Sequence, residues 1–407
     1  MIKNHIIYND YSDWTFDLAK AQGSYLWTKD GKKLIDFTSG WNVTNLGWNN
    51  EEIASALTQQ IKKNTYAPMW SSDPIQNALA EALTRSLPRQ LNAVGRATGG
   101  TEANEEAMKT ARAYTGRKKI LGFRNTYHGQ SFGTMSIGYL PEYVKDISPL
   151  VGDFMQLDFP KVFGSNKNPQ DVLANFEKEL ESALSTNEIA ALVTEAGIIT
   201  GWGSTHIAPA SFLTTVRKLT KKYGTLLILD EVGTGFSRCG ELYGMLLENV
   251  VPDIATFAKG LSNGVAAIGA MVTREDIANK TISKSNLTST FGWTPIACAG
   301  ALKTLEIHLR DKVWEKAKKD GKFLVEKLGN EFKGDHRVSN VRGIGMEVGV
   351  TCTDPNMMGK VVNKARENGL HLAMCSDGNI QLMPPLVIDR QVLEQGIEIF
   401  LDTVRKL

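Results

Sequence analysis

The sequence has few of the residues that build metal centres or disulfide frameworks. Its 407 residues include four cysteines, at positions 239, 298, 352 and 375, and no two of them form a C-x-x-C pair. Zinc sites and small disulfide-rich domains need closer or more numerous cysteines. We therefore expect no bound metal and no disulfide, as is typical of a protein in a reducing compartment.

The sequence also lacks an excess of charge of one sign and lacks long apolar runs. The 46 basic and 44 acidic side chains leave a net charge of +2, which is too small to indicate a nucleic-acid partner. No stretch approaches the roughly 20 apolar residues of a membrane span, and residues 1–10 do not have the pattern of a signal peptide. We expect a cytoplasmic protein that binds neither nucleic acid nor a membrane.

The sequence does contain the alternating pattern of an α/β protein. Helical periodicity in residues 51–61 and 211–219 alternates with short apolar runs at 190–193 and 226–229. Such alternation predicts a mostly parallel sheet covered by helices on both faces. Farther along, the pattern predicts one long helix over residues 302–328, followed by strands around a glycine turn.

An acidic residue and a lysine follow two strongly apolar stretches. Asp230 ends the first stretch, and Lys259 lies 29 positions further along the chain. Open α/β sheets bind ligands at the carboxyl ends of their strands. Pyridoxal phosphate needs a lysine amine to hold its aldehyde and a carboxylate to keep its ring nitrogen protonated. Taken singly, Asp230 is more commonly a cap or turn residue and Lys259 a solvated side chain.

A third motif, in residues 97–112, has the pattern of a phosphate-binding turn. Gly99 and Gly100 precede Thr101 and a stretch rich in helix-forming residues. The free amide groups at the start of such a helix, together with a hydroxyl group, bind phosphate. An ordinary helix cap at Thr101 is the alternative. The motif is not a G-x-x-x-x-G-K-[ST] loop, which disfavours a nucleotide triphosphatase.

A tyrosine and a histidine form a fourth motif. Tyr127 and His128 precede Gly129, shortly after a strand predicted at residues 119–123. The ring of Tyr127 is suited to lie flat on a pyridine ring, although a tyrosine near a turn is more commonly a half-buried surface residue. We expect His128 to order the loop rather than to act as a base.

In this order, the motifs resemble those of class III pyridoxal-phosphate-dependent aminotransferases, which belong to the aspartate aminotransferase superfamily. The resemblance extends from residues 22–37, which are similar to the family's N-terminal hairpin, to residues 383–386. Its most specific block covers residues 229–240, followed by 252–254 and 257–260. It implies an α/β fold of fold type I, with a large domain built on a mostly parallel sheet and a small α+β domain.

The resemblance also implies a division of the chain and a function. We expect residues 1–50 to be the N-terminal segment of the small domain, residues 51–305 the large cofactor-binding domain, and residues 306–407 the C-terminal part of the small domain. The implied activity is a ping-pong transfer of an amino group from an amine or amino acid to a keto or aldehyde acceptor, with pyridoxal 5'-phosphate as cofactor. Racemases, epimerases, aminomutases and lyases use the same scaffold, and a non-catalytic protein that binds the cofactor is an alternative of another class.

Matching the family's motifs residue by residue implies a role for each site residue. Asp230 would pair with the ring nitrogen, and Lys259 would hold the aldehyde and move a proton, while Tyr127 and Val232 would pack on the two faces of the ring. The implied catalytic residues are Lys259, Asp230 and Glu195, and the implied cofactor-binding residues are Gly100, Thr101, Tyr127, His128, Asp230, Val232, Lys259 and Thr290.

Further residues are implied at the substrate site and at a subunit contact. Thr290 matches a threonine that reaches the phosphate of the neighbouring subunit in this family, which implies a homodimer with shared active sites. Trp41 and Glu195 would line the substrate site. Gln381 would also lie there, at a position where many family members carry the arginine that binds a substrate α-carboxylate.

The sequence departs from the family pattern at several of these positions. Besides Gln381, Met374 stands near the alternative position for an arginine, and neither residue is basic. Gly233 replaces a glutamine whose side chain bonds the ring hydroxyl in the family. Smaller departures occur at residues 196 and 291–295. The identity of the substrates stays open, and we expect glutamate and 2-oxoglutarate to be poor co-substrates.

Overall fold

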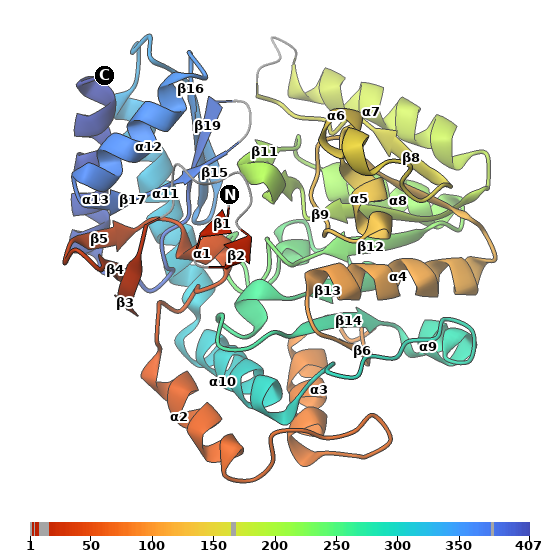
Figure 1. The fold of residues 1–407 in the computed structure, drawn as a ribbon. Coiled ribbons are helices and arrows are strands. Elements are labelled where there is room, and N and C mark those ends of the chain that lie inside the picture. Colours follow the sequence, from red (N-terminus) through yellow and green to blue (C-terminus); the bar gives the residue numbers. More distant parts are fainter. Residues whose placement is uncertain (1, 4, 8–15, 164–167, 376–377) are drawn as a thin grey trace.

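The central element of the structure is a seven-stranded sheet (Figure 1). This computed structural model describes residues 2–3, 5–7, 16–163, 168–375 and 378–407. In spatial order the strands are β6 (Ala93–Ala97), β14 (Gly269–Thr273), β13 (Ile254–Phe257), β12 (Leu226–Asp230), β9 (Ile189–Glu195), β7 (Lys119–Phe123) and β8 (Phe154–Leu157). Neighbours from β13 to β8 are parallel, whereas β14 is antiparallel to both β13 and β6. The predicted mostly parallel sheet is confirmed.

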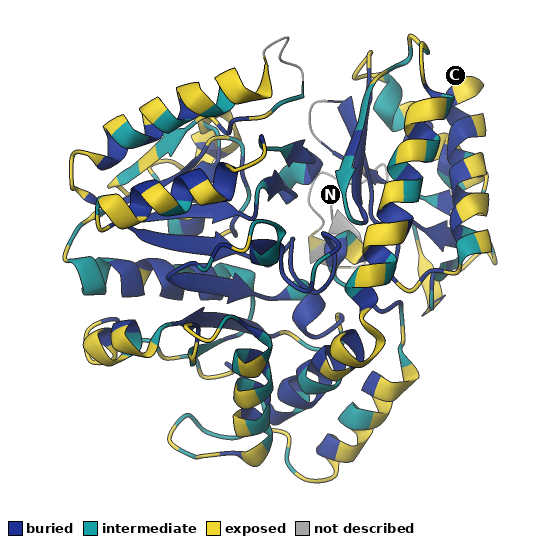
Figure 2. Ribbon diagram, turned by 180° about the vertical axis from the view of Figure 1, so that it is seen from behind, coloured by how far each residue is buried: buried dark blue, intermediate teal, exposed yellow. Residues whose placement is uncertain are grey.

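Helices cover both faces of this sheet because its strands are apolar on both sides. Every residue of β9 and β12 is buried. Along β12, Ile228 packs in one cluster with Ala107 of helix α4 (Gly100–Thr115), whereas Leu227 and Leu229 pack in another with Phe212 of helix α8 (Phe212–Lys222). Successive side chains of a strand point to opposite faces, so the two clusters lie on the two sides of the sheet. Figure 2 shows the buried strands and the exposed outer faces of the helices.

Several shorter elements surround the sheet. The helices are α3 (Pro74–Ser86), α5 (Phe132–Gly138), α6 (Pro141–Val144), α7 (Pro169–Leu184) and α9 (Glu275–Thr281), and the small strands are β10 (Ile198–Ile199) and β11 (His206–Ile207). Helix α10 (Pro295–Asp311) packs against α3 and against α2 (Glu51–Ile61).

A second lobe combines the two ends of the chain. One sheet has the order β15 (Val338–Ile344), β16 (Glu347–Cys352), β19 (Asn379–Leu382) and β18 (Ala373–Met374), and the other has the order β17 (Leu370–His371), β5 (Lys33–Asp36), β4 (Tyr25–Thr28) and β3 (Leu18–Gln22). The remaining elements there are α1 (Ser39–Asn42), α11 (Val313–Glu331), α12 (Met357–Glu367), α13 (Arg390–Arg405) and the short pair β1 (Ile2–Lys3) and β2 (Ile6–Ile7). The N-terminal strand β5 pairs with the C-terminal strand β17, as the predicted small domain requires. The domain boundaries themselves stay a prediction.

The expectation of one long helix over 302–328 is wrong. The chain forms α10 and α11 instead, and Lys312 between them has a left-handed backbone with φ 45°. Since glycine most often adopts this conformation, a lysine gives no signal of the break in the sequence.

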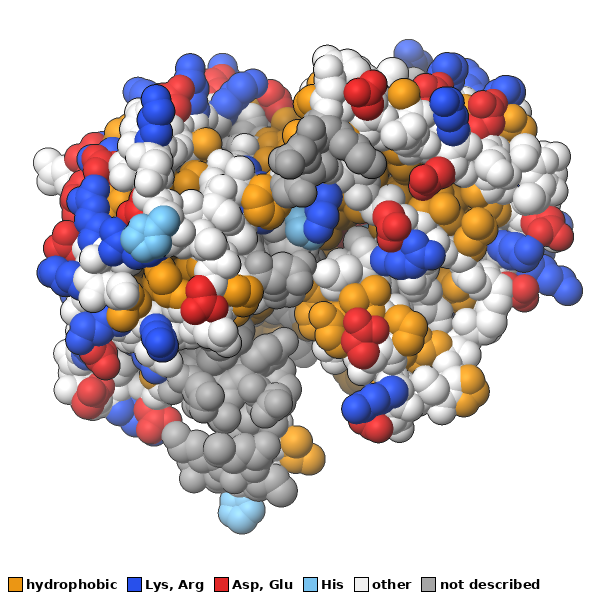
Figure 3. Space-filling model, turned by 90° about the horizontal axis from the view of Figure 1, so that it is seen from above, with side chains coloured by type: hydrophobic (Ala, Val, Ile, Leu, Met, Phe, Trp, Pro, Cys, Tyr) orange, Lys and Arg blue, Asp and Glu red, His pale blue; other side chains and the backbone are white. Residues whose placement is uncertain are grey.

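The structure also describes the state of the cysteines, the apolar character of the helices and the grouping of side chains that could bind a metal. The four cysteines are free and buried. In the described ranges, no helix has both the length and the apolar character needed to cross a membrane, and no three His, Cys, Asp or Glu side chains are grouped to hold a metal ion. Over the face drawn in Figure 3, basic and acidic side chains are interspersed.

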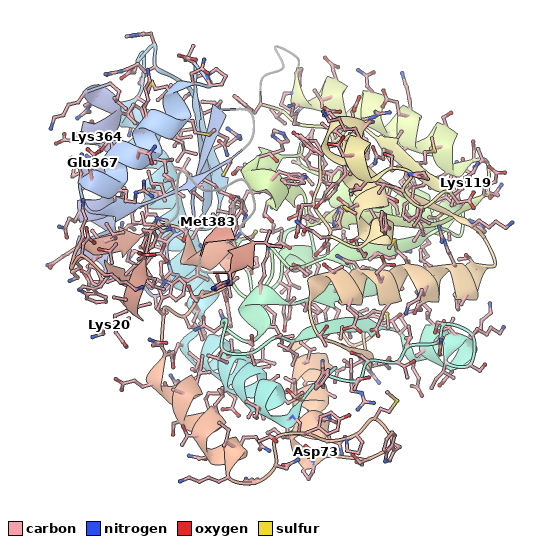
Figure 4. All side chains as sticks on the ribbon, in the orientation of Figure 1. Lys20, Asp73, Lys119, Lys364, Glu367 and Met383 are labelled. Carbon is pink, nitrogen blue, oxygen red and sulfur yellow. The ribbon has the colours of Figure 1, made fainter. Side chains whose placement is uncertain are left out.

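The carboxyl ends of the parallel strands point toward the second lobe. Lys119, at the amino end of β7, lies at the outer edge of the molecule, whereas Met383 lies beside the second lobe (Figure 4). The backbone carbonyl of Met383 accepts a hydrogen bond of 2.7 Å from Ser39 in α1. The parallel strands therefore run from the outer edge, where Lys119 lies, toward the lobe that contains Met383.

Candidate active site

A cavity of about 370 Å³ lies at the carboxyl ends of the central strands. Its walls come from segments that end or follow β6, β7, β9, β12 and β13, so five strands contribute to one site. Val43, which follows α1, adds a wall from the second lobe. Ligands of open α/β sheets bind in this position, and cavities of this size hold small molecules.

Asp230 and Lys259 come to this cavity from neighbouring parallel strands. Asp230 ends β12 beside Thr256 of β13, and Lys259 follows shortly after the end of β13. Lys259 has a φ of 45°, which is uncommon for a residue other than glycine. Both side chains line the cavity. Within the described part of the chain, the Lys259 amine has no hydrogen-bond or ion-pair partner.

Three donors fix the orientation of the buried Asp230 carboxylate. His128 donates from Nδ1 (2.7 Å) and Asn104 from Nδ2 (2.8 Å) to one oxygen, and the backbone N–H of Val232 donates to the other (2.9 Å). Asn104 is itself held, because its side-chain oxygen accepts from Thr256 (2.7 Å). An ionised carboxylate can accept about four hydrogen bonds, so Asp230 keeps the capacity to accept one from a protonated ring nitrogen.

The glycine turn before α4 has the geometry of an anion site. The helix begins at Gly100, and the residue that precedes it, Gly99, is extended and caps no amide with a side chain. The first amides of the helix are therefore free to bind an anion. Thr101 lies inside the helix, so the alternative in which it is an ordinary cap is wrong. A Cβ at Gly100 would lie 3.1 Å from both methyl groups of Val232, which explains the glycine.

Tyr127 and Val232 line the cavity from different segments. Tyr127 follows β7, and the ring of Trp202 packs edge-on against it at 5.4 Å. The backbone of Gly201 also approaches Tyr127 closely, because a Cβ at Gly201 would lie 2.8 Å from the Cβ of Tyr127. These contacts hold the tyrosine in the wall of the cavity, as stacking on a ring requires.

Glu195 ends β9 and lies beside Asp230 in the parallel register. Its buried carboxyl group accepts hydrogen bonds from the Thr200 backbone (3.0 Å), the Thr200 hydroxyl (2.5 Å) and the Gly201 backbone (3.2 Å). Burial raises the pKa of Glu195, and the negative charge of Asp230 raises it further. Glu195 therefore provides a carboxyl group that takes up a proton more readily than an exposed glutamate.

Gln381 lies next to the cavity but is fully buried and is not part of its wall. Its side-chain amide donates to the carbonyl of Thr200 (3.3 Å) and to the carboxyl group of Glu347. Burial raises the pKa of Glu347 to about 7. A second buried acid thus contacts the position at which, by the family resemblance, many members carry a basic side chain.

Two other predicted residues do not line the cavity, and a third is described only in part. Trp41 packs with Ala373 and Met383 at the second lobe, and Thr290 is exposed in a loop. The side chain of Met374 lies outside the described parts of the structure. The predicted residues that do meet in the cavity are Gly100, Thr101, Tyr127, His128, Glu195, Asp230, Val232 and Lys259.

Sequence reasoning missed Asn104 and Thr200, which also line the cavity. Asn104 lies one turn after Gly100, so helical spacing from the glycine turn was a usable signal. Thr200 lies five residues beyond Glu195, after the small strand β10, and nothing in that spacing indicates that the chain folds back onto the carboxylate.

These groups fit pyridoxal phosphate. Free helix amides suit its phosphate, the Asp230 carboxylate suits its ring nitrogen, and the unpaired amine of Lys259 suits its aldehyde. When bound, this cofactor supplies an electron sink for a carbanion at the substrate carbon. The fold and the site together define a fold type I pyridoxal-phosphate enzyme.

Comparison with known proteins identifies the family. The family model for class III aminotransferases matches residues 6–404. An acetylornithine aminotransferase from Archaeoglobus fulgidus is 31% identical over 403 residues, which is 98% of each chain. An (S)-enantioselective omega-transaminase from Thermomicrobium roseum has a TM-score of 0.92 at 30% identity, covering 99% of this chain and 96% of its own. A PLP-bound amine transaminase from an uncultivated Pseudomonas species has a TM-score of 0.92 at 28% identity, covering 98% and 96%.

The chain therefore belongs to the class III aminotransferases, enzymes that transfer amino groups with pyridoxal phosphate. The predicted family, fold type and cofactor are confirmed. The relatives do not favour the racemase, mutase, lyase and non-catalytic alternatives.

Replacing Lys259 by alanine should abolish turnover and the visible absorption of the bound cofactor. The described cavity wall contains no other lysine, so no second amine is in position to hold the aldehyde. Absorption spectra of the reconstituted protein and a transamination assay measure both effects. Lys119→Ala, far from the cavity, is the control and should behave like the wild type. Wild-type spectra and activity in Lys259→Ala would contradict the assignment.

Replacing Asp230 by alanine should leave some cofactor bound but lower the turnover number by about a hundredfold or more. The phosphate turn is intact in this variant, whereas the charge that stabilises the protonated ring nitrogen is lost. Steady-state kinetics at saturating cofactor measure the effect. An unchanged turnover number would mean that another group, such as the neighbouring His128, serves the ring nitrogen.

Proposed function

We propose that Lys259, Asp230 and Glu195 are the catalytic residues of this aminotransferase. The observation that carries the proposal is the convergence of two parallel strand ends, which bring an unpaired amine and a fixed carboxylate to one cavity. In this proposal the Lys259 amine holds the cofactor and moves a proton at the substrate carbon, and Asp230 keeps the ring nitrogen protonated. The amino group moves between an amine or amino acid and a keto or aldehyde acceptor in a ping-pong cycle.

A half-reaction tests the proposal directly. An amino donor without any acceptor should change the absorption of the bound cofactor and release about one carbonyl product per site. Racemisation, a mutase shift or elimination would instead continue beyond one product per site without an acceptor. Such continued product formation would show that the enzyme catalyses one of those reactions rather than amino transfer.

The cavity favours substrates without a carboxylate at the end that faces Glu195. Among the described residues of its wall, there is no arginine, and burial together with the charge of Asp230 raises the pKa of Glu195 more than His128 lowers it. Arg124, which follows β7, forms an exposed ion pair with Asp158 at 2.8 Å instead. We propose that the preferred amino donor carries a cationic, hydroxylated or neutral group there, and that Trp41 lies at the substrate entrance.

Glutamate and 2-oxoglutarate should be used about two to three orders of magnitude less efficiently than a substrate without the second carboxylate. A bidentate arginine contributes this much to carboxylate binding, and Gln381 provides only an amide that is already bonded to Glu347. Values of kcat/KM for glutamate, alanine and simple amines measure the preference. Efficient, saturable use of glutamate by the wild type would refute it.

A pair of variants tests the position of Gln381 in the same assay. Gln381→Arg should raise glutamate use, but only modestly, because the new guanidinium lies against the Glu347 carboxyl group. Adding Glu347→Gln should remove this competing partner and raise glutamate use further. If neither variant changes glutamate use, position 381 does not contact the substrate carboxylate.

We further propose a cytoplasmic homodimer with shared active sites. Exposed large apolar side chains support the dimer: Trp70 is 85% exposed, Ile282 76% and Phe291 64%. Ile282 lines one pocket with Met69, which precedes Trp70, and with Ser289, which precedes Thr290. Exposed apolar side chains close together are typical of a protein contact. Thr290 itself is exposed beside Phe291 rather than in the cavity of its own chain. The four free, buried cysteines favour a reducing compartment.

The active species should therefore be a homodimer whose two-fold interface lies beside the cofactor. Trp70→Glu with Phe291→Glu should yield monomers with little activity, since a partner's Thr290 is no longer near the phosphate. Light scattering and activity measured on the same samples test this prediction. A variant that is monomeric at assay concentration yet fully active would refute the shared site.

A further inference from the structure

The chemistry of pyridoxal phosphate determines which wall of the cavity each ring substituent faces. The ring nitrogen of pyridoxal phosphate is opposite the aldehyde-bearing carbon, so a ring held by Asp230 and Lys259 would have its axis between these two residues. The carbons that carry the phosphate arm and the hydroxyl group flank the aldehyde on opposite sides. If the amino end of α4 held the phosphate arm, the ring hydroxyl group would face the opposite wall.

The order of the strands identifies that opposite wall. Gly100 follows β6, which lies on one side of the β13–β12 pair, whereas Glu195 ends β9 on the other side. The residues that line the cavity on the β9 side include Glu195, Thr200 and Gly201. Thr200 is the only one of these three with a hydroxyl group.

The hydroxyl group of Thr200 has bonding capacity left. It lies 2.5 Å from a carboxyl oxygen of Glu195, and this is its one hydrogen bond among the described residues. A hydroxyl group can donate one hydrogen bond and accept two, so a second partner in the cavity is possible. The backbone of Thr200 is fixed on both sides, because its N–H donates to Glu195 and its carbonyl accepts from Gln381 and from the N–H of Gly203.

Thr200 also occupies the space beside Gly233. A Cβ built on Gly233 would lie 2.0 Å from the hydroxyl oxygen of Thr200 and 3.2 Å from its Cβ. A side chain at position 233 would force the Thr200 hydroxyl group to move, so Gly233 and Thr200 form a matched pair. Within this wall, Thr200 provides a polar group where position 233 provides none.

We propose that Thr200 is a cofactor-binding residue whose hydroxyl group bonds the ring hydroxyl oxygen of pyridoxal phosphate and links that oxygen to Glu195. The proposal rests on the proposed function, because it requires the ring to lie between Asp230 and Lys259. The raised pKa of Glu195 agrees with it. The Thr200 hydroxyl group, which donates to Glu195 in the structure, would instead donate to the ring oxygen and stabilise its negative charge, and Glu195 would donate to Thr200 when it carries a proton.

The test uses the full-length protein reconstituted with pyridoxal phosphate. The wild type must first show a visible absorption band whose intensity changes with pH. The pH at which half of this change has occurred is the pH midpoint of the band. If no band forms, the proposed function fails, which is distinct from a failure of this inference.

Thr200→Val removes the hydroxyl group at nearly constant volume. Losing a donor to the ring oxygen should raise the pH midpoint of the band by about one unit and weaken cofactor binding about tenfold or more. Thr200→Ser keeps the hydroxyl group and should stay close to the wild type. A Thr200→Val variant with the wild-type midpoint and dissociation constant would overturn the proposal.

The chain offers a matched control on its surface. Thr214 bonds Glu248 through both its N–H and its hydroxyl group, each at 3.0 Å, as Thr200 bonds Glu195. Thr214→Val should leave the midpoint and the cofactor dissociation constant unchanged. A shift as large as that of Thr200→Val would show that the effect does not come from the cavity, which counts against the proposal.

A compensating pair of substitutions decides the question if Thr200→Val does not fold. Gly233→Gln alone should lose cofactor binding, because its Cβ collides with Thr200. Gly233→Gln combined with Thr200→Gly should recover both cofactor binding and the pH midpoint, since a carboxamide then replaces the threonine hydroxyl group. A double variant that binds the cofactor no better than Gly233→Gln would refute the shared space.

Discussion

The site depends on the parallel register of β9, β12 and β13. In that register Glu195 lies beside Asp230, and Asp230 lies beside Thr256, three positions before Lys259. A shift of one residue would turn each side chain to the opposite face of the sheet. The same shift would also exchange the apolar residues that pack against α4 and α8. The packing of the core therefore fixes the relative positions of the amine and the two carboxyl groups.

Close approaches of the backbone shape the cavity around these groups. At Gly100, Gly201 and Gly233, a Cβ would lie within about 3 Å of Val232, Tyr127 and Thr200, respectively. Each glycine thus allows a neighbouring side chain to reach the cavity wall. Because a glycine has no side chain, each of these neighbours has room at the cavity wall, and in the proposed arrangement these neighbours contact the cofactor.

The sequence predicted the parts of the site that are local in the chain. Asp230 and Lys259 follow apolar strands, and the glycine turn before α4 lies within one short segment, so pattern and motif sufficed. The contacts that the sequence did not predict join distant segments. Glu347 and Gln381 are 34 positions apart and meet only because β16 and β19 pair. The break at Lys312 was missed for a different reason, because the residue itself does not favour a left-handed conformation.

Two buried acids lie on the Gln381 side of the site: Glu195 lines the cavity, whereas Glu347 bonds Gln381 outside its wall. Glu195 receives backbone and hydroxyl donors, and Glu347 receives side-chain amides from Asn42 and Gln381. An ionised carboxylate costs several kcal/mol to bury, and neutral donors offset only part of this cost, so burial raises the pKa of both groups. A guanidinium at position 381 would instead lower the pKa of Glu347, whose carboxyl group the Gln381 amide contacts. An amide there leaves the pKa of both buried acids raised, which supports the proposed preference for substrates that bring a positive charge or hydrogen-bond donors.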